Sequence, residues 1–88
     1  MRASTLEQLR QYVDDGAGPN AFLYSCLANN LIGAGVNARN DDLEELKDIC
    51  CWILSEVPPM LRGSPPAVNE WIAANHANRL ASHKQLTA

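Results

Sequence analysis

No long apolar run occurs in this 88-residue chain. The longest apolar stretches, such as residues 50–54, span about five residues, whereas a helix that crosses a membrane needs about 18 or more. The first residues also lack the apolar segment of a secretion signal. We therefore expect a cytoplasmic protein that does not cross a membrane, folded as one domain over residues 1–88.

Basic residues are also few. The chain has seven Lys and Arg against ten Asp and Glu, with a net charge of -3. Binding to a phosphate backbone strengthens with the number of phosphates that are neutralised, so nucleic acid is disfavoured as a partner.

Cysteine and histidine are scarce and lack the spacing of metal ligands. Cys26, Cys50 and Cys51 form no Cys-x-x-Cys pair, and adjacent cysteines on a helix cannot meet disulfide geometry. His76 and His83 lie beyond residue 75 in a polar part of the chain, and no Gly-x-Ser-x-Gly elbow is present. We therefore predict no metal, no cofactor and no enzymatic activity, and we expect a reducing compartment.

No segment alternates β-branched and polar residues between turn signals, so strands are not expected. The apolar spacing instead predicts an all-α fold, a compact bundle of about four short helices. In the first of these, residues 5–15, Ser4 and Glu7 have the spacing of a capping box. Gly16 is expected to end it in the left-handed conformation.

The second predicted helix covers residues 19–32. Pro19 suits the first helical position, and Gly33 and Gly35 are expected to stop the helix. Its apolar side is expected to face the core and consists of Phe22, Leu23, Cys26, Leu27 and Leu31.

Asn40 or Asp41 is expected to cap the third predicted helix, which ends before Pro58. Its apolar stripe is broad, so we expect it to be the central and most buried helix. The stripe consists of Leu43, Leu46, Ile49, Cys50, Trp52, Ile53, Leu54 and Val57.

The fourth predicted helix begins at Pro65 with Ser64 as its N-cap. Residues 74–88 are interpreted as an exposed or frayed tail of this helix. The expected core residues of this helix are Val68, Trp71, Ile72 and Leu80.

Several polar and aromatic side chains are candidates for binding a partner. Asn30 falls near the apolar side of the second helix, where its amide would either bond a helix end or contact a partner. We favour a surface position for Tyr24 and Arg62, and a core position for Trp52 and Trp71. Tyr12 is ambiguous between the two.

Acidic residues gather at the start of the third helix. Asp42, Glu45 and Asp48 are expected to form a solvated acidic face that steers a basic partner surface. A chain this short has an expected stability of only about 4–13 kcal/mol, so a homodimer that covers further apolar surface stays an alternative.

Residues 9–72 resemble short accessory proteins carried by tailed bacteriophages and prophages, a group without an assigned activity. The most specific parts of the resemblance are Phe-Leu-x-x-x-Leu-x-Asn-Asn-Leu, residues 22–31, and Gly-Ser-Pro, residues 63–65. Further matching positions are Tyr12, Val13, Gly16, Pro19, Leu46, Ile49, Trp52, Ile53, Glu56, Val57, Pro58, Val68 and Trp71.

The resemblance implies a phage-encoded protein that binds a host protein. Our leading hypothesis is therefore a small helical protein-interaction module that inhibits a host defence or regulatory complex by covering a surface. The alternative is a small helix-turn-helix-like DNA-binding regulator built from the second and third helices. The acidic start of the third helix argues against it, because phosphates would repel it.

Overall fold

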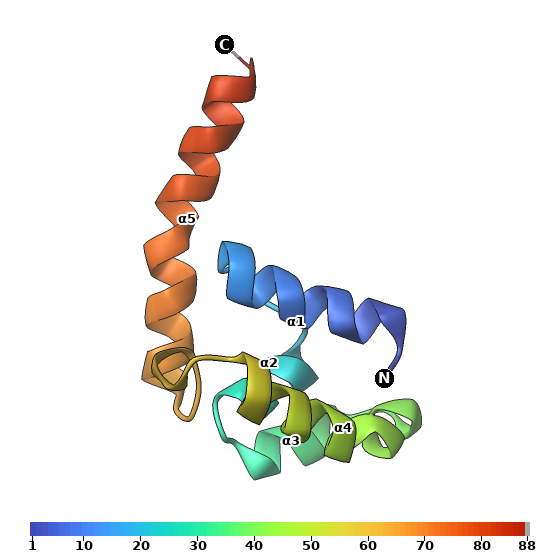
Figure 1. Ribbon diagram of the computed structural model, residues 1–88. Helices are drawn as coiled ribbons and strands as arrows, with labels where there is room; N and C mark the ends of the chain where they lie inside the picture. Colours follow the sequence, from blue (N-terminus) through green and yellow to red (C-terminus); the bar gives the residue numbers. More distant parts are fainter. Residues whose placement is uncertain (88) are drawn as a thin grey trace.

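The computed structural model describes the backbone of residues 1–87 and the side chains of residues 1–76. Within residues 1–87 the chain forms five α-helices, one short 3-10 helix and no strand (Figure 1), which confirms the all-α prediction. The expectations for Leu80 and His83 lie outside the described side chains. The elements are α1 (Ala3–Asp15), α2 (Ala21–Leu27), α3 (Leu31–Asn37), α4 (Asn40–Glu56), η1 (Pro59–Leu61) and α5 (Pro65–Thr87).

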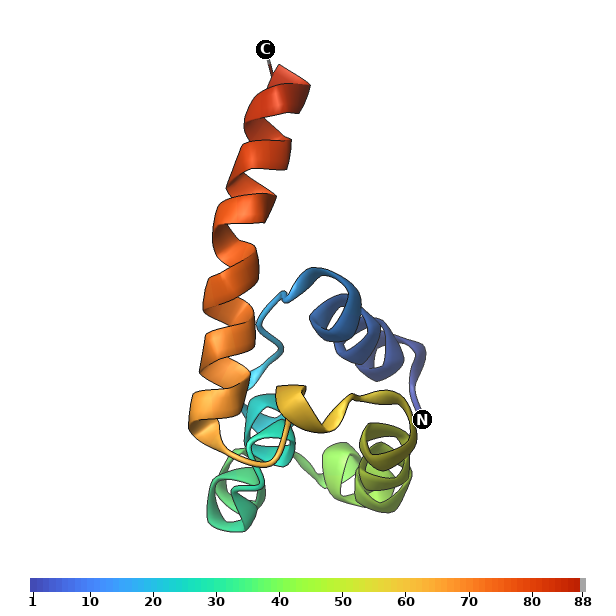
Figure 2. The ribbon, with the colours of Figure 1, turned by 60° about the vertical axis from the view of Figure 1, so that its left-hand side comes forward.

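The short helix α2 lies at the centre of the fold, with α3, α4 and α5 around it (Figures 1 and 2). Phe22, Leu23 and Leu27 are each buried, as is Ala28 at its end. Burying these apolar side chains is the main source of stability for a helix of only seven residues, which would not persist alone in water.

The prediction that the third helix would be the most buried is wrong. This helix is α4, and it buries Ile49 and Ile53 but leaves Leu43 53% and Leu54 70% exposed. Cys50, expected in the core, is also exposed. The apolar stripe is wider than the surface that α2 covers, so one side of the stripe has no neighbouring helix packed over it.

Helix α5 is anchored by its first turns. Val68 is fully buried, and Trp71 and Ile72 pack against the core. The indole Nε1 of Trp71 donates to the backbone oxygen of Tyr12 at 2.6 Å, which fixes α5 to α1. The backbone stays helical to Thr87, and the C-terminal half of α5 extends away from the other helices (Figures 1 and 2).

The single helix predicted over residues 19–32 is wrong, because the chain turns between α2 and α3. Asn29 adopts the left-handed conformation with φ 58°, which asparagine tolerates better than most residues. Asn30 then caps α3 by accepting a hydrogen bond from the backbone N–H of Gly33 at 2.9 Å. Asparagine pairs favour such a turn because one residue ends a helix and the next begins another.

Other helix ends follow the predictions to different degrees. Gly16 ends α1 with φ 67°, as predicted, and the Ser64 hydroxyl accepts from the Ala67 N–H at 3.3 Å at the start of α5. The predicted capping box at Ser4 is wrong, since α1 already begins at Ala3. Asn20, rather than Pro19, marks the start of α2, where its side chain accepts from the Leu23 N–H.

Gly33 and Gly35 lie inside α3 rather than ending a helix. A Cβ added at Gly35 meets no atom within 4 Å, so Gly35→Ala is expected to raise the free energy of unfolding by about 0.5–1 kcal/mol, because alanine loses less conformational entropy than glycine in a helix. Urea unfolding measures the change.

Gly33→Ala is the matched control. Its Cβ would lie 2.6 Å from the Asn30 amide nitrogen and 2.8 Å from the Ser25 hydroxyl, so it is expected to destabilise the fold by about 1–3 kcal/mol. A destabilising Gly35→Ala would contradict the helical assignment of α3.

Candidate interaction surface

Two of the three predicted acidic residues, Asp42 and Glu45, form hydrogen bonds and ion pairs with Arg2. Arg2 donates from Nη2 to Asp42 Oδ1 at 2.5 Å and from Nε to Glu45 Oε2 at 2.5 Å, and its backbone N–H also donates to Glu45. Asp42 further accepts from the Arg39 N–H at 2.9 Å, at the start of α4. Asp48 has a side chain that is 67% exposed, as expected for a solvated face, and its Oδ2 lies 3.9 Å from the N-terminal ammonium group of Met1. The acidic face predicted to steer a partner is therefore largely neutralised by Arg2.

These contacts shift the pKa values of both carboxyl groups downward. The backbone hydrogen bond from Arg39 is the largest cause of the lowered pKa of Asp42, and Arg2 adds to it. For Glu45, desolvation raises the pKa, but the hydrogen bonds from the backbone and side chain of Arg2 prevail and lower it. Arg2 in turn has a raised pKa, first because of Glu45 and then because of Asp42.

The lowered pKa values predict a loss of stability in acid. A carboxyl group with a lower pKa in the folded chain stabilises the fold above its unfolded pKa, about 4, and this contribution disappears as the pH falls through the folded value. Arg2→Gln is therefore expected to lower the melting temperature at pH 7, and the difference from the wild-type chain should shrink below about pH 4.

Thermal unfolding monitored by circular dichroism at several pH values measures this difference. Arg10→Gln is the control, because no salt bridge joins the exposed Arg10 to a carboxylate in the described part of the chain. Equal pH profiles for the Arg2→Gln and Arg10→Gln variants would contradict the role given to Arg2.

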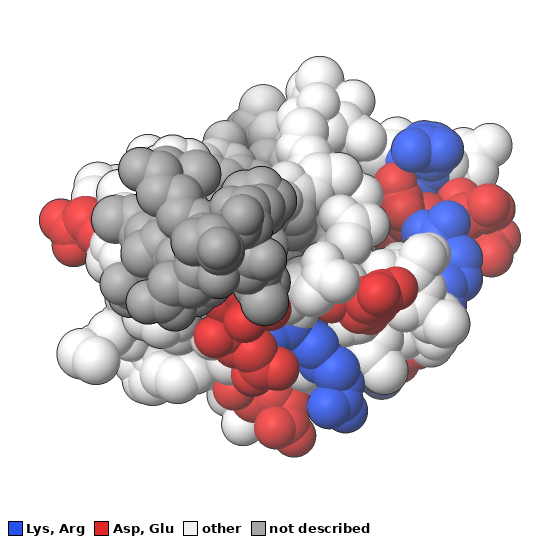
Figure 3. All heavy atoms as spheres, turned by 90° about the horizontal axis from the view of Figure 1, so that it is seen from above, with Lys and Arg blue, Asp and Glu red and all other residues white. Residues whose placement is uncertain are grey.

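Charges of both signs are interleaved on the face shown in Figure 3. Lys and Arg side chains lie directly beside Asp and Glu side chains, and no broad patch of one sign is visible on this face. Steering of a partner by charge needs a sizeable field of one sign. The described part of this face therefore shows no sizeable field of one sign.

The remaining predicted binding residues lie at separate places. Tyr24 is half-buried, and its hydroxyl donates to Asn69 Oδ1 at 2.7 Å, which links α2 to α5. Asn30 is exposed and caps α3. Arg62 is half-buried, and its Nε donates to the backbone oxygen of Val57 at 3.0 Å. Asn30 and Arg62 line two adjoining hollows, and Tyr24 lines neither of them.

The aromatic residues expected in the core follow that expectation in part. Trp52 and Trp71 are partly buried against the core. Tyr12 is completely buried, and its hydroxyl donates to the backbone oxygen of Leu61 at 2.6 Å.

An exposed apolar surface on α3 escaped prediction. Leu31 and Ile32 are each 77% exposed and Val36 is 79% exposed, and α3 contains no charged residue. Leu31 was expected in the core, but the turn at Asn29 moves it out of the face that α2 buries. We call Leu31, Ile32 and Val36 the α3 apolar surface. Several large aliphatic side chains exposed together are typical of an interaction site.

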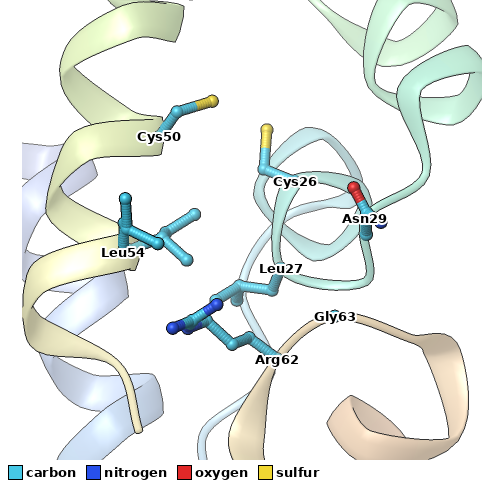
Figure 4. A pocket seen from close by; sticks show the side chains of 8 residues that line it. Cys26, Leu27, Asn29, Cys50, Leu54, Arg62 and Gly63 are labelled. Carbon is cyan, nitrogen blue, oxygen red and sulfur yellow. The ribbon is translucent and has the colours of Figure 1, made fainter. Parts of the chain in front are cut away.

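A groove runs beside the α3 apolar surface, between α2 and α3 on one side and α4 on the other. It consists of two adjoining hollows of about 260 and 120 Å³, both of which reach Cys26, Asn29 and Cys50. Figure 4 shows Cys26 and Cys50 pointing into the same space from α2 and α4, with Arg62 extending toward α4. We call this the α3–α4 groove. Its other lining residues are Ser25, Leu27, Asn30, Leu31, Ala34, Leu46, Ile53, Leu54, Arg62 and Gly63.

The Cys26 thiol of the groove is not activated as a nucleophile. Burial, with smaller effects from Cys50 and Asp42, raises the pKa of the Cys26 thiol to about 11, so almost no thiolate forms there at neutral pH. Among the residues whose side chains are described, no three His, Cys, Asp or Glu residues are grouped so as to hold a metal ion. The groove offers apolar contact, one guanidinium and a few amide groups.

Comparisons with protein-family models, with curated proteins and with solved structures give no match for this chain. None of the helices, within the residues that the structure describes, is long and apolar enough to cross a membrane.

Proposed function

We propose that this chain is a protein-interaction module that binds a partner protein through the α3 apolar surface. The observation that carries the proposal is the exposure of Leu31, Ile32 and Val36, each above three-quarters, on a helix without charge. Exposed aliphatic side chains gain free energy when a partner covers them, at about 25 cal/mol for each Å² removed from water. In the free chain these three side chains contribute little to stability because they stay in water, whereas in a complex their burial would contribute to the free energy of binding.

The same surface favours a protein over nucleic acid. Helices α2 and α3 with their short turn resemble a helix-turn-helix in outline, with α3 in the position of the reading helix. A reading helix needs Arg, Lys, Asn or Gln side chains for base edges and phosphates, whereas α3 presents leucine, isoleucine and valine. DNA binding therefore stays the weaker proposal.

The shape of the groove also favours a protein partner. Pockets for small molecules usually enclose their ligand within about 300–1,000 Å³, whereas neither hollow reaches this volume by itself, about 260 and 120 Å³, and both are open to solvent. Recesses of this size suit individual side chains of a binding protein. The likeness to phage accessory proteins adds the proposal that the partner belongs to a bacterial host and that binding blocks a defence or regulatory complex.

Photo-cross-linking in bacterial cells tests this function. A photoreactive amino acid replaces either Ile32 on the α3 apolar surface or Met60, which is 82% exposed on η1 and outside the groove. We expect the Ile32 variant to form a discrete cross-linked product with a host protein and the Met60 variant to form none. Identical products from both positions, or none from Ile32, would contradict the proposal.

A further inference from the structure

Resting on this proposed function, we propose that the α3–α4 groove binds an amphipathic helix of the partner whose apolar stripe is followed by an acidic side chain, and that Arg62 receives this carboxylate. The exposed α3 surface alone does not specify the chemistry of the partner, because it has no charged residue. That chemistry follows from the length of the groove, its lining and its charge.

The length of the groove fits a short helix. Its wall on α4 extends from Leu46 to Leu54, and eight residues of helix rise about 12 Å at 1.5 Å per residue. A docked helix that lies along this wall presents side chains at positions i, i+4 and i+7 over the same distance. The two hollows would each receive one of these side chains.

The lining of the groove is apolar along its length. Leu46, Ile53 and Leu54 line it from α4, and Leu31 and Ala34 from α3. Leu43, Cys50 and Leu54 lie on one stripe of α4 by their spacing of seven and four residues, and each of them is exposed. A helix placed here would cover that stripe together with Leu31 and Ala34 of α3.

The charge of the groove selects an acidic partner. No Asp or Glu lines either hollow, although the chain as a whole has a net charge of -3. Arg62 is half-buried beside Leu27 and Leu54, and no salt bridge joins it to a carboxylate in the described part of the chain. Lys47 is exposed next to the same stripe of α4. The Nε of Arg62 donates to the backbone oxygen of Val57, and its two Nη groups can hold a carboxylate with two parallel hydrogen bonds.

A display library of random 16-residue peptides, selected on the full chain, provides the probe. We expect the enriched peptides to share large apolar residues at i, i+4 and i+7, with Asp or Glu within one turn of the stripe. The dissociation constant of one such synthetic peptide is then measured by fluorescence anisotropy. Arg62→Gln is expected to weaken binding about tenfold or more, because a hydrogen bond between two charged groups is lost.

Three further variants serve as controls for the charge of Arg62, for the loss of an arginine elsewhere and for access to the groove. Arg62→Lys retains the charge and should lose less affinity, Arg10→Gln should bind as the wild type does, and Cys50→Trp should block the part of the groove that both hollows share. Melting temperatures of all variants exclude loss of the Arg62–Val57 hydrogen bond as the cause.

The outcomes separate this inference from the proposed function. The inference would be overturned if the enriched peptides lacked an acidic residue and bound the Arg62→Gln variant as tightly as the wild type. If the same peptides lost affinity for the Ile32→Asp variant, the α3 apolar surface would remain as the binding site. Peptides that bound the Ile32→Asp and Cys50→Trp variants as tightly as the wild type would contradict both the proposed function and this inference. Absence of enriched peptides would also overturn the inference. So would sedimentation that shows a dimer of this chain which the Cys50→Trp substitution dissociates, because a second copy of the chain would then occupy the groove.

Discussion

Replacing Tyr12 with alanine is expected to lower the free energy of unfolding by about 3–5 kcal/mol, since a completely buried aromatic side chain would leave a cavity. This is a large share of the roughly 4–13 kcal/mol expected for a domain of this size. Tyr12→Phe separates the hydrogen bond from the packing. It removes the donor to the backbone oxygen of Leu61, and a buried carbonyl without a partner costs about 1–3 kcal/mol.

Tyr24→Phe is the matched control for this hydrogen bond. The Tyr24 hydroxyl also donates a short hydrogen bond, to Asn69, but at an exposed position where water can replace it. We expect its loss to cost less than about 1 kcal/mol. Urea unfolding of the Tyr12→Ala, Tyr12→Phe and Tyr24→Phe variants measures all three, and an equal cost for both phenylalanine variants would show that the Tyr12–Leu61 bond has no special role.

Gly16→Ala is the second substitution with a large expected effect, about 2–5 kcal/mol of destabilisation. Gly16 has φ 67°, a conformation that costs a residue with a Cβ about 1–2 kcal/mol. The new Cβ would also lie 2.5 Å from the Cβ of Asn75 on α5, and such overlap typically costs about 1–3 kcal/mol. The end of α1 and the middle of α5 would have to move apart.

Two variants divide this cost into its parts. Gly63→Ala meets no atom within 4 Å at φ 101°, so it reports the cost of positive φ without overlap. Asn75→Gly in the Gly16→Ala background removes the overlapping atom, and we expect a coupling free energy of about 1 kcal/mol or more between the two positions. Additive effects in urea unfolding would contradict the close contact of α1 and α5.

Local signals in the sequence were enough to predict much of the fold. Gly16, the Pro58–Pro59 pair and Ser64 mark helix ends through backbone conformation and capping, which depend on near neighbours alone. The break at Asn29 was missed because asparagine is compatible with a helix interior, and the apolar residues on both sides continue a helical spacing. The left-handed conformation of Asn29 and the cap that Asn30 provides separate α3 from α2, and neither follows from the apolar spacing.

The candidate site was harder to predict because it depends on distant parts of the chain. Arg2 reaches Asp42 and Glu45 across about 40 residues, and no local pattern indicates that pairing. Leu31 has the same spacing as a core residue, and its exposure follows from the turn at Asn29. Two of the predicted binding residues, Asn30 and Arg62, line the α3–α4 groove, one in each hollow.

Affinity capture from a bacterial lysate with paired surface variants tests the central claim most directly. Ile32→Asp and Met60→Asp each place a charge at an exposed apolar position, 77% and 82% exposed in the wild-type chain. Aspartate in the first turn of α3 is compatible with the helix, so both variants should fold with the circular dichroism spectrum of the wild type. If α3 is the binding surface, the Met60→Asp variant captures the same host protein as the wild type, and the Ile32→Asp variant captures at least about tenfold less, as expected when a charge is buried in an apolar contact. Equal capture by both variants would contradict the account.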